Sequence, residues 1–133
     1  MIFLTRGQAN TVAVTLYEKT TIDPDLVYYL FQFTNAQTNV SVYCIPTDTS
    51  QFINRYNLFS ITETGSPDPL AGEVTLDKGE QHYFVYEQLS STNLDPSGLT
   101  LVESGIVRVY EAPASDDIYQ NTSPLYEVYN GGK

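Results

Sequence analysis

Short runs of β-forming residues, separated by turn residues, are the feature that most limits what this chain can fold into. In residues 11–17, Val12, Val14 and Leu16 alternate with other residues, which places them on one face of an extended strand. Roughly eight such runs follow one another, with turn residues about every 8–12 positions. No window has the period of a long amphipathic helix. The pattern predicts an all-β fold, an antiparallel β-sandwich.

One run differs from the others because it is bulky on both faces. In residues 27–34 one face carries an aliphatic residue and three aromatic residues, and the opposite face carries Tyr28, Leu30 and Gln32. Such a composition is expected of an internal strand that is covered on both sides. The predicted strands cover residues 2–5, 11–17, 27–34, 40–45, 55–62, 72–76, 83–86 and 101–109.

A corner before the strand at residues 83–86 suggests the type of sandwich. Leu76, Gly79 and Tyr83 resemble the tyrosine corner of immunoglobulin-like sandwiches, in which a tyrosine hydroxyl bonds back to the preceding turn. We therefore expect residues 1–112 to form an immunoglobulin-like β-sandwich. The single cysteine, Cys44, excludes an internal disulfide framework and is expected in the core of this domain.

Residues 113–133 have a different character, and we expect them to form an extended C-terminal arm. Their apolar residues lie among polar spacers and are too few to build a core, so an isolated arm would fray. We expect the arm to bind an open sheet edge of this domain or a neighbouring subunit. The apolar residues of the arm are Ile118, Tyr119, Leu125, Tyr126, Val128 and Tyr129.

The charge balance argues against several classes of partner. Six Lys and Arg against sixteen Asp and Glu give a formal net charge of −10, which opposes binding to phosphate groups. Nucleic acid is therefore not an expected partner. The first residues lack the pattern of a signal peptide and no later window has the length of a membrane span, so we expect synthesis in a cytoplasm and no membrane partner.

The inventory of reactive side chains does not predict an enzyme. His82 is the only histidine, and its place at the start of a strand is typical of a surface side chain. No second histidine or pair of lysines accompanies the serines and threonines as a base. We predict no catalytic residues and no cofactor.

Loop aspartates leave one alternative for a metal. Asp23, Asp25, Asp48, Asp68 and Asp95 could supply oxygen ligands for Ca²⁺ if their loops met at one end of the sandwich. Aspartates in turns also bond to their own backbone, and this local role is the one we favour. No metal site is therefore predicted.

Aromatic residues are more numerous than one small core requires. The chain has eleven Tyr and six Phe but no Trp, and Tyr is enriched where protein surfaces meet. Two alternatives stay open, because Tyr also favours strands and both sheet faces could be covered within the domain. The predicted partner interface combines strand residues with the arm: Tyr28, Phe84, Tyr86, Ile118, Tyr119, Leu125, Tyr126, Val128 and Tyr129.

Three stretches, at residues 28–38, 47–61 and 84–109, resemble small structural proteins of crAss-like tailed bacteriophages. They read YYLFQFTNAQT, TDTSQFINRYNLFSI and FVYEQLSSTNLDPSGLTLVESGIVRV. The resemblance implies a virion protein, an auxiliary (decoration) capsid protein that docks on the major capsid lattice. Its partners would be the major capsid protein, other virion proteins or a second copy.

Two alternatives remain beside this expectation. Within the structural class, the chain could be a neck, tail or fibre-attachment subunit. From a different class, it could be a carbohydrate-adhesion module in which Tyr rings stack on sugars, although the absence of Trp counts against that role.

Overall fold

The computed structural model describes residues 2–23, 26–50 and 56–111. In these residues the chain forms strands and one short 3-10 helix, with no α-helix, as the sequence predicts. Residues 112–133, and with them the predicted arm, lie outside the described residues. The elements are β1 (Ile2–Thr5), β2 (Ala9–Val14), β3 (Tyr28–Asn35), β4 (Ser41–Cys44), β5 (Asn57–Glu63), η1 (Pro69–Ala71), β6 (Glu73–Val74), β7 (Gly79–Gln88) and β8 (Thr100–Tyr110).

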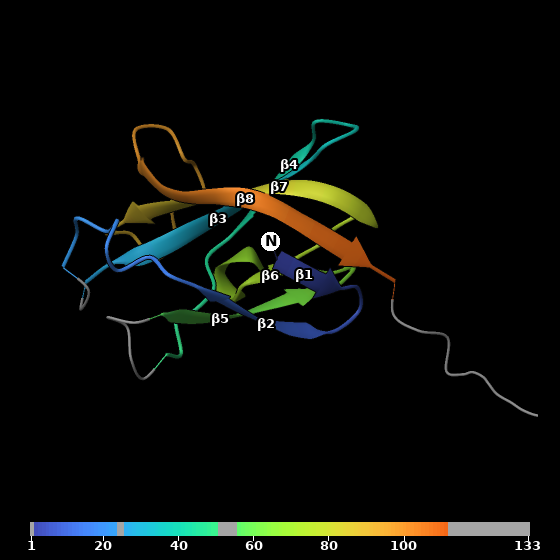
Figure 1. Ribbon diagram of the computed structural model, residues 1–133, viewed down its shortest axis with the longest axis horizontal. Coiled ribbons are helices and arrows are strands. Elements are labelled where there is room, and N and C mark those ends of the chain that lie inside the picture. The colour runs from blue at the N-terminus through green and yellow to red at the C-terminus, as the bar shows by residue number, and fades with distance from the viewer. Residues whose placement is uncertain (1, 24–25, 51–55, 112–133) are drawn as a thin grey trace, which may run out of the picture.

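The strands form two mixed sheets that lie as two layers, which is consistent with a β-sandwich (Figure 1). One sheet has five strands in the order β1-β8-β7-β3-β4, and the other has three in the order β2-β5-β6. Most neighbours are antiparallel. The pairs β1–β8 and β5–β6 are parallel, so the prediction of a purely antiparallel sandwich is wrong; alternation along the chain does not tell which way neighbouring strands run.

The core lies between the two sheets, and period-two alternation predicts it well. Val12, Val14 and Leu16 are buried on one face, as expected. From the opposite sheet, the ring of Phe31 meets Phe59 edge to face, with ring centroids 4.9 Å apart. Tyr29 meets the same Phe59 ring at 5.8 Å. Aromatic side chains therefore join the two sheets near the centre of the domain.

β3 is an internal strand, as its composition predicts. It pairs with β7 on one side and β4 on the other. Its core face is buried, and on the opposite face Leu30 is also fully buried. The hairpin to β4 turns at residues 36–39, where Asn39 has a φ of 61°. The amide N–H groups of Gln37 and Thr38 donate to the Asn35 side chain, so a local asparagine shapes this turn.

The predicted tyrosine corner is wrong. The Tyr83 hydroxyl donates to Glu103 on β8, at 3.4 Å, and not to the turn that precedes β7. The side-chain amide of Gln81 bonds to that turn instead, donating to the carbonyl of Asp77 at 2.9 Å. Gly105 makes room for the Tyr83 ring, because a Cβ atom at Gly105 would lie 2.8 Å from it.

Several strand limits differ from the prediction because pairing, and not local propensity, sets them. β7 and β8 are longer than expected, since each continues as a ladder against its neighbour. A register shift between Val85 and Tyr86 indicates a β-bulge in this pair. β2 stops at Val14, before Tyr17, and β6 has only two residues.

Candidate functional site

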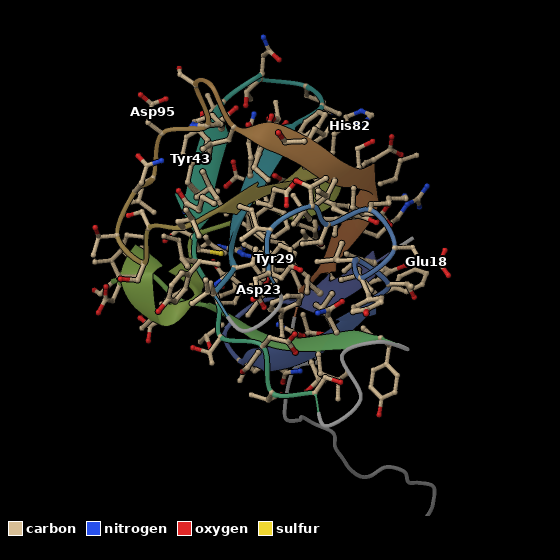
Figure 2. All side chains as sticks on the ribbon, turned by 90° about the vertical axis from the view of Figure 1, so that its left-hand side faces the viewer. Glu18, Asp23, Tyr29, Tyr43, His82 and Asp95 are labelled. Carbon is tan, nitrogen blue, oxygen red and sulfur yellow. The ribbon has the colours of Figure 1, made fainter. Side chains whose placement is uncertain are left out.

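The candidate site is the outer face of the five-stranded sheet, meaning the surface that points away from the core. Strand register places Tyr43, Gln32, Phe84 and Ser104 side by side across β4, β3, β7 and β8. Figure 2 shows Tyr43 and His82 on the same side of the molecule. On this face Leu101 lies opposite Tyr86, and Glu80 lies opposite Arg108 beyond His82. By alternation along each strand, the centre of the outer face comprises Tyr28, Leu30, Gln32, Thr34, Ser41, Tyr43, His82, Phe84, Tyr86, Ser104 and Ile106.

No Asp, Glu, Lys or Arg belongs to this set of residues. Two positions beyond His82 along the same face, Glu80 on β7 forms an ion pair with Arg108 on β8 at 3.6 Å. The centre of the face is thus aromatic and uncharged, with charges at its margin.

A chain of side-chain hydrogen bonds orders the polar part of the outer face. The Tyr86 hydroxyl donates to the Gln32 side-chain oxygen at 3.3 Å. The Gln32 amide donates to Thr34 at 3.0 Å and to Ser41 at 3.3 Å, and the two hydroxyls lie 2.8 Å apart. Because these groups bond to one another, a partner can cover the face without leaving them unpaired.

The three predicted interface residues on described strands lie on this face. Phe84 and Tyr86 are half-buried at its centre, and Tyr28 is 44% exposed near one end. Tyr86 lies opposite Leu30, two positions from Tyr28. The arm residues of the predicted interface lie outside the described residues.

Sequence reasoning missed Tyr43 and Ile106, which belong to the same face. Tyr43 lies opposite Gln32, and Ile106 lies opposite His82. Alternation in each strand shows that these side chains point away from the core. It does not show which strand neighbours which, so register was needed to bring them together.

Tyr28 also lines a hollow of about 380 Å³ at the end of the sandwich. Asp48 is the carboxylate in its lining, but Asp48 already accepts bonds from the amide of Asn57 and the backbone N–H of Leu58. The hollow therefore offers an aromatic ring and apolar walls more than a free carboxylate. Its lining comprises Val27, Tyr28, Tyr29, Ile45, Pro46, Thr47, Asp48, Phe59, Leu70 and Ser91.

Two buried carboxylates hold loops in place. Glu87 accepts from the backbone N–H groups of Thr21 and Ile22, at 2.8 and 3.0 Å, and also from the Thr21 hydroxyl. Glu63 accepts from the backbone N–H groups of Gly7 and Leu76. Both carboxylates are occupied by these hydrogen bonds, so neither is available as a general acid or base.

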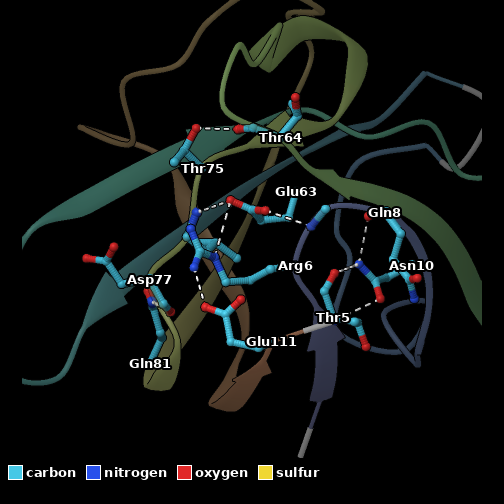
Figure 3. A network of polar contacts seen from close by, with 12 residues as sticks. Thr5, Arg6, Gln8, Asn10, Glu63, Thr64, Thr75, Asp77, Gln81 and Glu111 are labelled. Carbon is cyan, nitrogen blue, oxygen red and sulfur yellow. Dashed lines mark hydrogen bonds and ion pairs between the residues drawn. The ribbon is translucent and has the colours of Figure 1, made fainter. Parts of the chain in front are cut away.

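Arg6 connects the end of β8 to this acidic network (Figure 3). Its guanidinium pairs with Glu111, just after β8, and its Nε lies 3.9 Å from Glu63 on β5. The side-chain bond with Glu111 is the main reason that the pKa of Arg6 is raised. The network fixes where the chain leaves the sandwich after β8.

The single His and the single Cys of the chain lie in the ordinary places of a surface residue and a core residue. His82 is exposed, as expected of a surface side chain. Cys44 is fully buried in the core, as predicted, and burial raises the pKa of its thiol to about 12. A neutral, buried thiol is a poor nucleophile.

The loop aspartates adopt the local role that we favoured. Asp48, Asp68 and Asp95 each accept a bond from the backbone N–H two residues further on. The bonds from Ser97 lower the pKa of Asp95. Asp23 and Asp95 lie well apart in Figure 2. The described residues contain no group of three or more His, Cys, Asp or Glu placed to hold a metal ion, and Asp25 lies outside them.

Comparisons with protein-family models, curated proteins and solved structures give no significant match for this chain. Among the described residues, no helix is long and apolar enough to span a membrane.

Proposed function

We propose that this chain is a structural protein of a bacteriophage virion, an auxiliary capsid protein that docks on the major capsid lattice. In this role the outer face binds a capsid protein and the C-terminal arm adds further contacts. The work is binding, and many copies on a lattice add avidity. The resemblance of three stretches to virion proteins of crAss-like phages supports the assignment.

The uncharged, aromatic centre of the outer face is the observation that carries this proposal. The cores of protein interfaces are depleted of charge and enriched in aromatic residues, which matches Phe84, Tyr86 and Tyr43. The bonded chain from Tyr86 to Ser41 supports it further, since ordered polar groups lose little freedom on binding.

The strand connections support an immunoglobulin-like sandwich as part of the same proposal. In immunoglobulin domains the third strand pairs with the last two in one sheet, while the second and fifth pair in the other. Here β8, β7 and β3 are neighbours in one sheet, and β2 pairs with β5 in the other. An experimental structure in which these pairs differ would reject this part of the proposal.

The first experiment is quantitative mass spectrometry of purified virions. Copy numbers in proportion to the major capsid protein would support a lattice role. About a dozen copies would move the protein to the neck, tail or fibre attachment, the alternative within the structural class. Absence of the protein from virions would reject the proposal.

A matched pair of serine variants tests the outer face directly. Ser104 on β8 and Ser60 on β5 are both exposed, one on the outer face and one on the other sheet. Ser104→Asp puts a carboxylate beside Phe84 and should weaken capsid binding at least tenfold, because burying an unpaired charge is costly. Ser60→Asp should bind normally. Equal binding by both variants would move the interface elsewhere.

The hollow beside Tyr28 favours a second candidate, a carbohydrate-adhesion module. An aromatic ring at the edge of a hollow of about 380 Å³ is a suitable surface for stacking on a sugar. Binding of the purified protein to a glycan array, lost in Tyr28→Ala, would favour adhesion. No binding to the glycan array, together with binding to capsids, would favour the structural role.

A further inference from the structure

The outer edge of β2 is an unprotected strand edge. β2 pairs with β5 on one side and is the last strand of its sheet on the other. Proteins usually protect such edges with Lys, Pro or a bulge. Here the exposed side chains along the edge are small and uncharged: Ala9, Thr11, Ala13 and Thr15.

The hydrogen-bond pattern shows which backbone groups face this edge. The N–H of Glu63 donates to the carbonyl of Gln8 at 3.2 Å, so Gln8 and Glu63 are a hydrogen-bonded pair. Such pairs recur at every second residue of an antiparallel ladder, so Val12 and Val14 also bond toward β5. The N–H and C=O groups of Thr11, Ala13 and Thr15 therefore point outward. Within the described residues they have no hydrogen-bond partner.

The outer edge of β2 is covered at Asn10 and uncovered from residue 11 onward. The Asn10 side chain accepts from the N–H of Thr5 and donates to its carbonyl, so β1 occupies the space beside Asn10. β1 itself pairs with β8 in the other sheet. In immunoglobulin-like sandwiches a first strand lies beside the strand that β2 represents. No strand within the described residues occupies that position beside residues 11–15.

The segment after β8 is suited to this position. The chain leaves β8 at Glu111, which pairs with Arg6 close to the start of β2. Residues 125–129, LYEVY, form a short run rich in β-forming residues directly after Pro124, and they match the length of the open edge. The residues between Glu111 and Leu125 reach about 40 Å when extended. In an extended strand, alternation would put Tyr126 and Val128 on one face, as it does Val12 and Val14.

We infer that residues 125–129 of a second copy of this chain pair as an added antiparallel strand with residues 11–15, along the outer edge of β2 and the residue that follows it. A chain's own segment leaves at Glu111 and reaches the edge first where Asn10 and Thr5 close it, so it could lie antiparallel to β2 only after passing the whole edge and turning back. A second copy can enter from the open end and form the antiparallel ladder, which is more stable per residue. The inference deepens the proposed function, since it names the site that receives the arm.

Disulfide cross-linking between full-length chains tests the pairing. Cys44 is buried and can stay in place. An isotope-labelled Thr11→Cys chain is mixed with unlabelled chains that carry one cysteine at each position from 118 to 129. We expect linked pairs of labelled and unlabelled chains, with yields that alternate with period two within residues 125–129. Equal yields at all positions, or no linked pairs, would overturn the inference.

A chain that carries both cysteines separates pairing within a chain from exchange between chains. Linkage in Thr11→Cys/Tyr126→Cys that stays within one chain, without linkage between the mixed single variants, would overturn the assignment to a second copy.

Proline variants give a second, independent readout by analytical ultracentrifugation. Thr11→Pro removes an outward N–H and leaves the ladder with β5 intact, so self-association should weaken about tenfold, the loss of roughly one hydrogen bond. Ser41→Pro is the control on the free edge of β4, and it is compared with Ser41→Ala, which removes the same hydroxyl but keeps the N–H. There the N–H of Asn35 donates to Val40, so the Ser41 N–H also points outward. Weakened association in Ser41→Pro, with Thr11→Pro unaffected, would assign the edge to β4.

These outcomes are separate from the test of the virion role. Cross-linking and sedimentation use purified protein, whereas copy number is measured in particles. Loss of strand pairing would leave docking through the outer face untouched, and absence from virions would leave strand exchange untouched.

Discussion

At the residue scale, burial keeps two weakly acidic side chains neutral. Cys44 and Tyr83 are both less than 5% exposed. Burial is the main cause in each case and raises both pKa values to about 12, from ordinary values of 9.0 and 10.0. The fold therefore favours the protonated forms of both groups.

Alkaline pH should destabilise the protein for this reason. Both pKa values are higher in the folded protein, so their contribution to stability is complete below about pH 9 and is lost as the pH rises toward about 12. Denaturant titrations between pH 8 and pH 12 should show a falling free energy of unfolding. Tyr83→Phe should fall less steeply. An equal slope in both proteins would contradict this account.

Phe59 is the residue whose loss we expect to cost most, because both aromatic contacts between the sheets end on its ring. Phe59→Ala should lower the free energy of unfolding by about 3–5 kcal/mol. Phe3→Ala is the control, since Phe3 is 59% exposed and stacks on Tyr110 at the surface; it should cost less than about 1.5 kcal/mol. Urea unfolding measures both, and similar losses would contradict the assigned core.

At the scale of elements, buried carboxylates join loops to strands. Glu87 on β7 binds the backbone of residues 21 and 22, in the connection between β2 and β3. Glu63 on β5 binds the backbone of the segment before β2 and of the segment after β6. Both act through hydrogen bonds to N–H groups that are far away in sequence.

Glu87→Gln should loosen the connection before β3. An amide has one acceptor oxygen in place of two and must place its NH₂ group beside donors, so we expect a loss of about 1–3 kcal/mol. Amide hydrogen exchange at Thr21 and Ile22 should become faster, while β8 stays protected. Glu80→Gln is the control, because the Glu80 side chain is 43% exposed and its pair with Arg108 should contribute little. Unchanged exchange at both amides would contradict the role of Glu87.

At the scale of the whole molecule, the described core is complete without the C-terminal arm. The buried cluster draws on residues from Ile2 to Val109 in both sheets. An arm that buried several hundred Å² of apolar surface on a partner, at about 25 cal/mol per Å², would gain several kcal/mol against its ordering cost.

Deletion of residues 114–133 should therefore leave the domain folded and weaken attachment to the capsid. Circular dichroism and thermal unfolding measure the first part, and co-sedimentation with capsids measures the second. Ser60→Asp in the full chain controls for a general loss of binding. Unfolding of the shortened chain would reject the division between domain and arm.

The sequence by itself determined the class of fold, the number of strands and most of the core. Alternation is a local property: it states which side of a strand a residue such as Val14 or Phe31 occupies, whatever the neighbours are. The turns at residues 36–39 and the local bonding of Asp95 were predictable for the same reason, since the contacts lie within a few residues.

Only the tertiary structure decided which strands are neighbours. The parallel pairing of β1 with β8, the uncharged centre of the outer face and the open edge of β2 depend on contacts between residues far apart in the chain. The tyrosine corner failed likewise, because the hydroxyl of Tyr83 meets Glu103 across a strand pair whose register local sequence does not fix. The burial of Glu63 and Glu87 was decided in the same way, since a carboxylate is stable in a core only where distant N–H groups are brought to it.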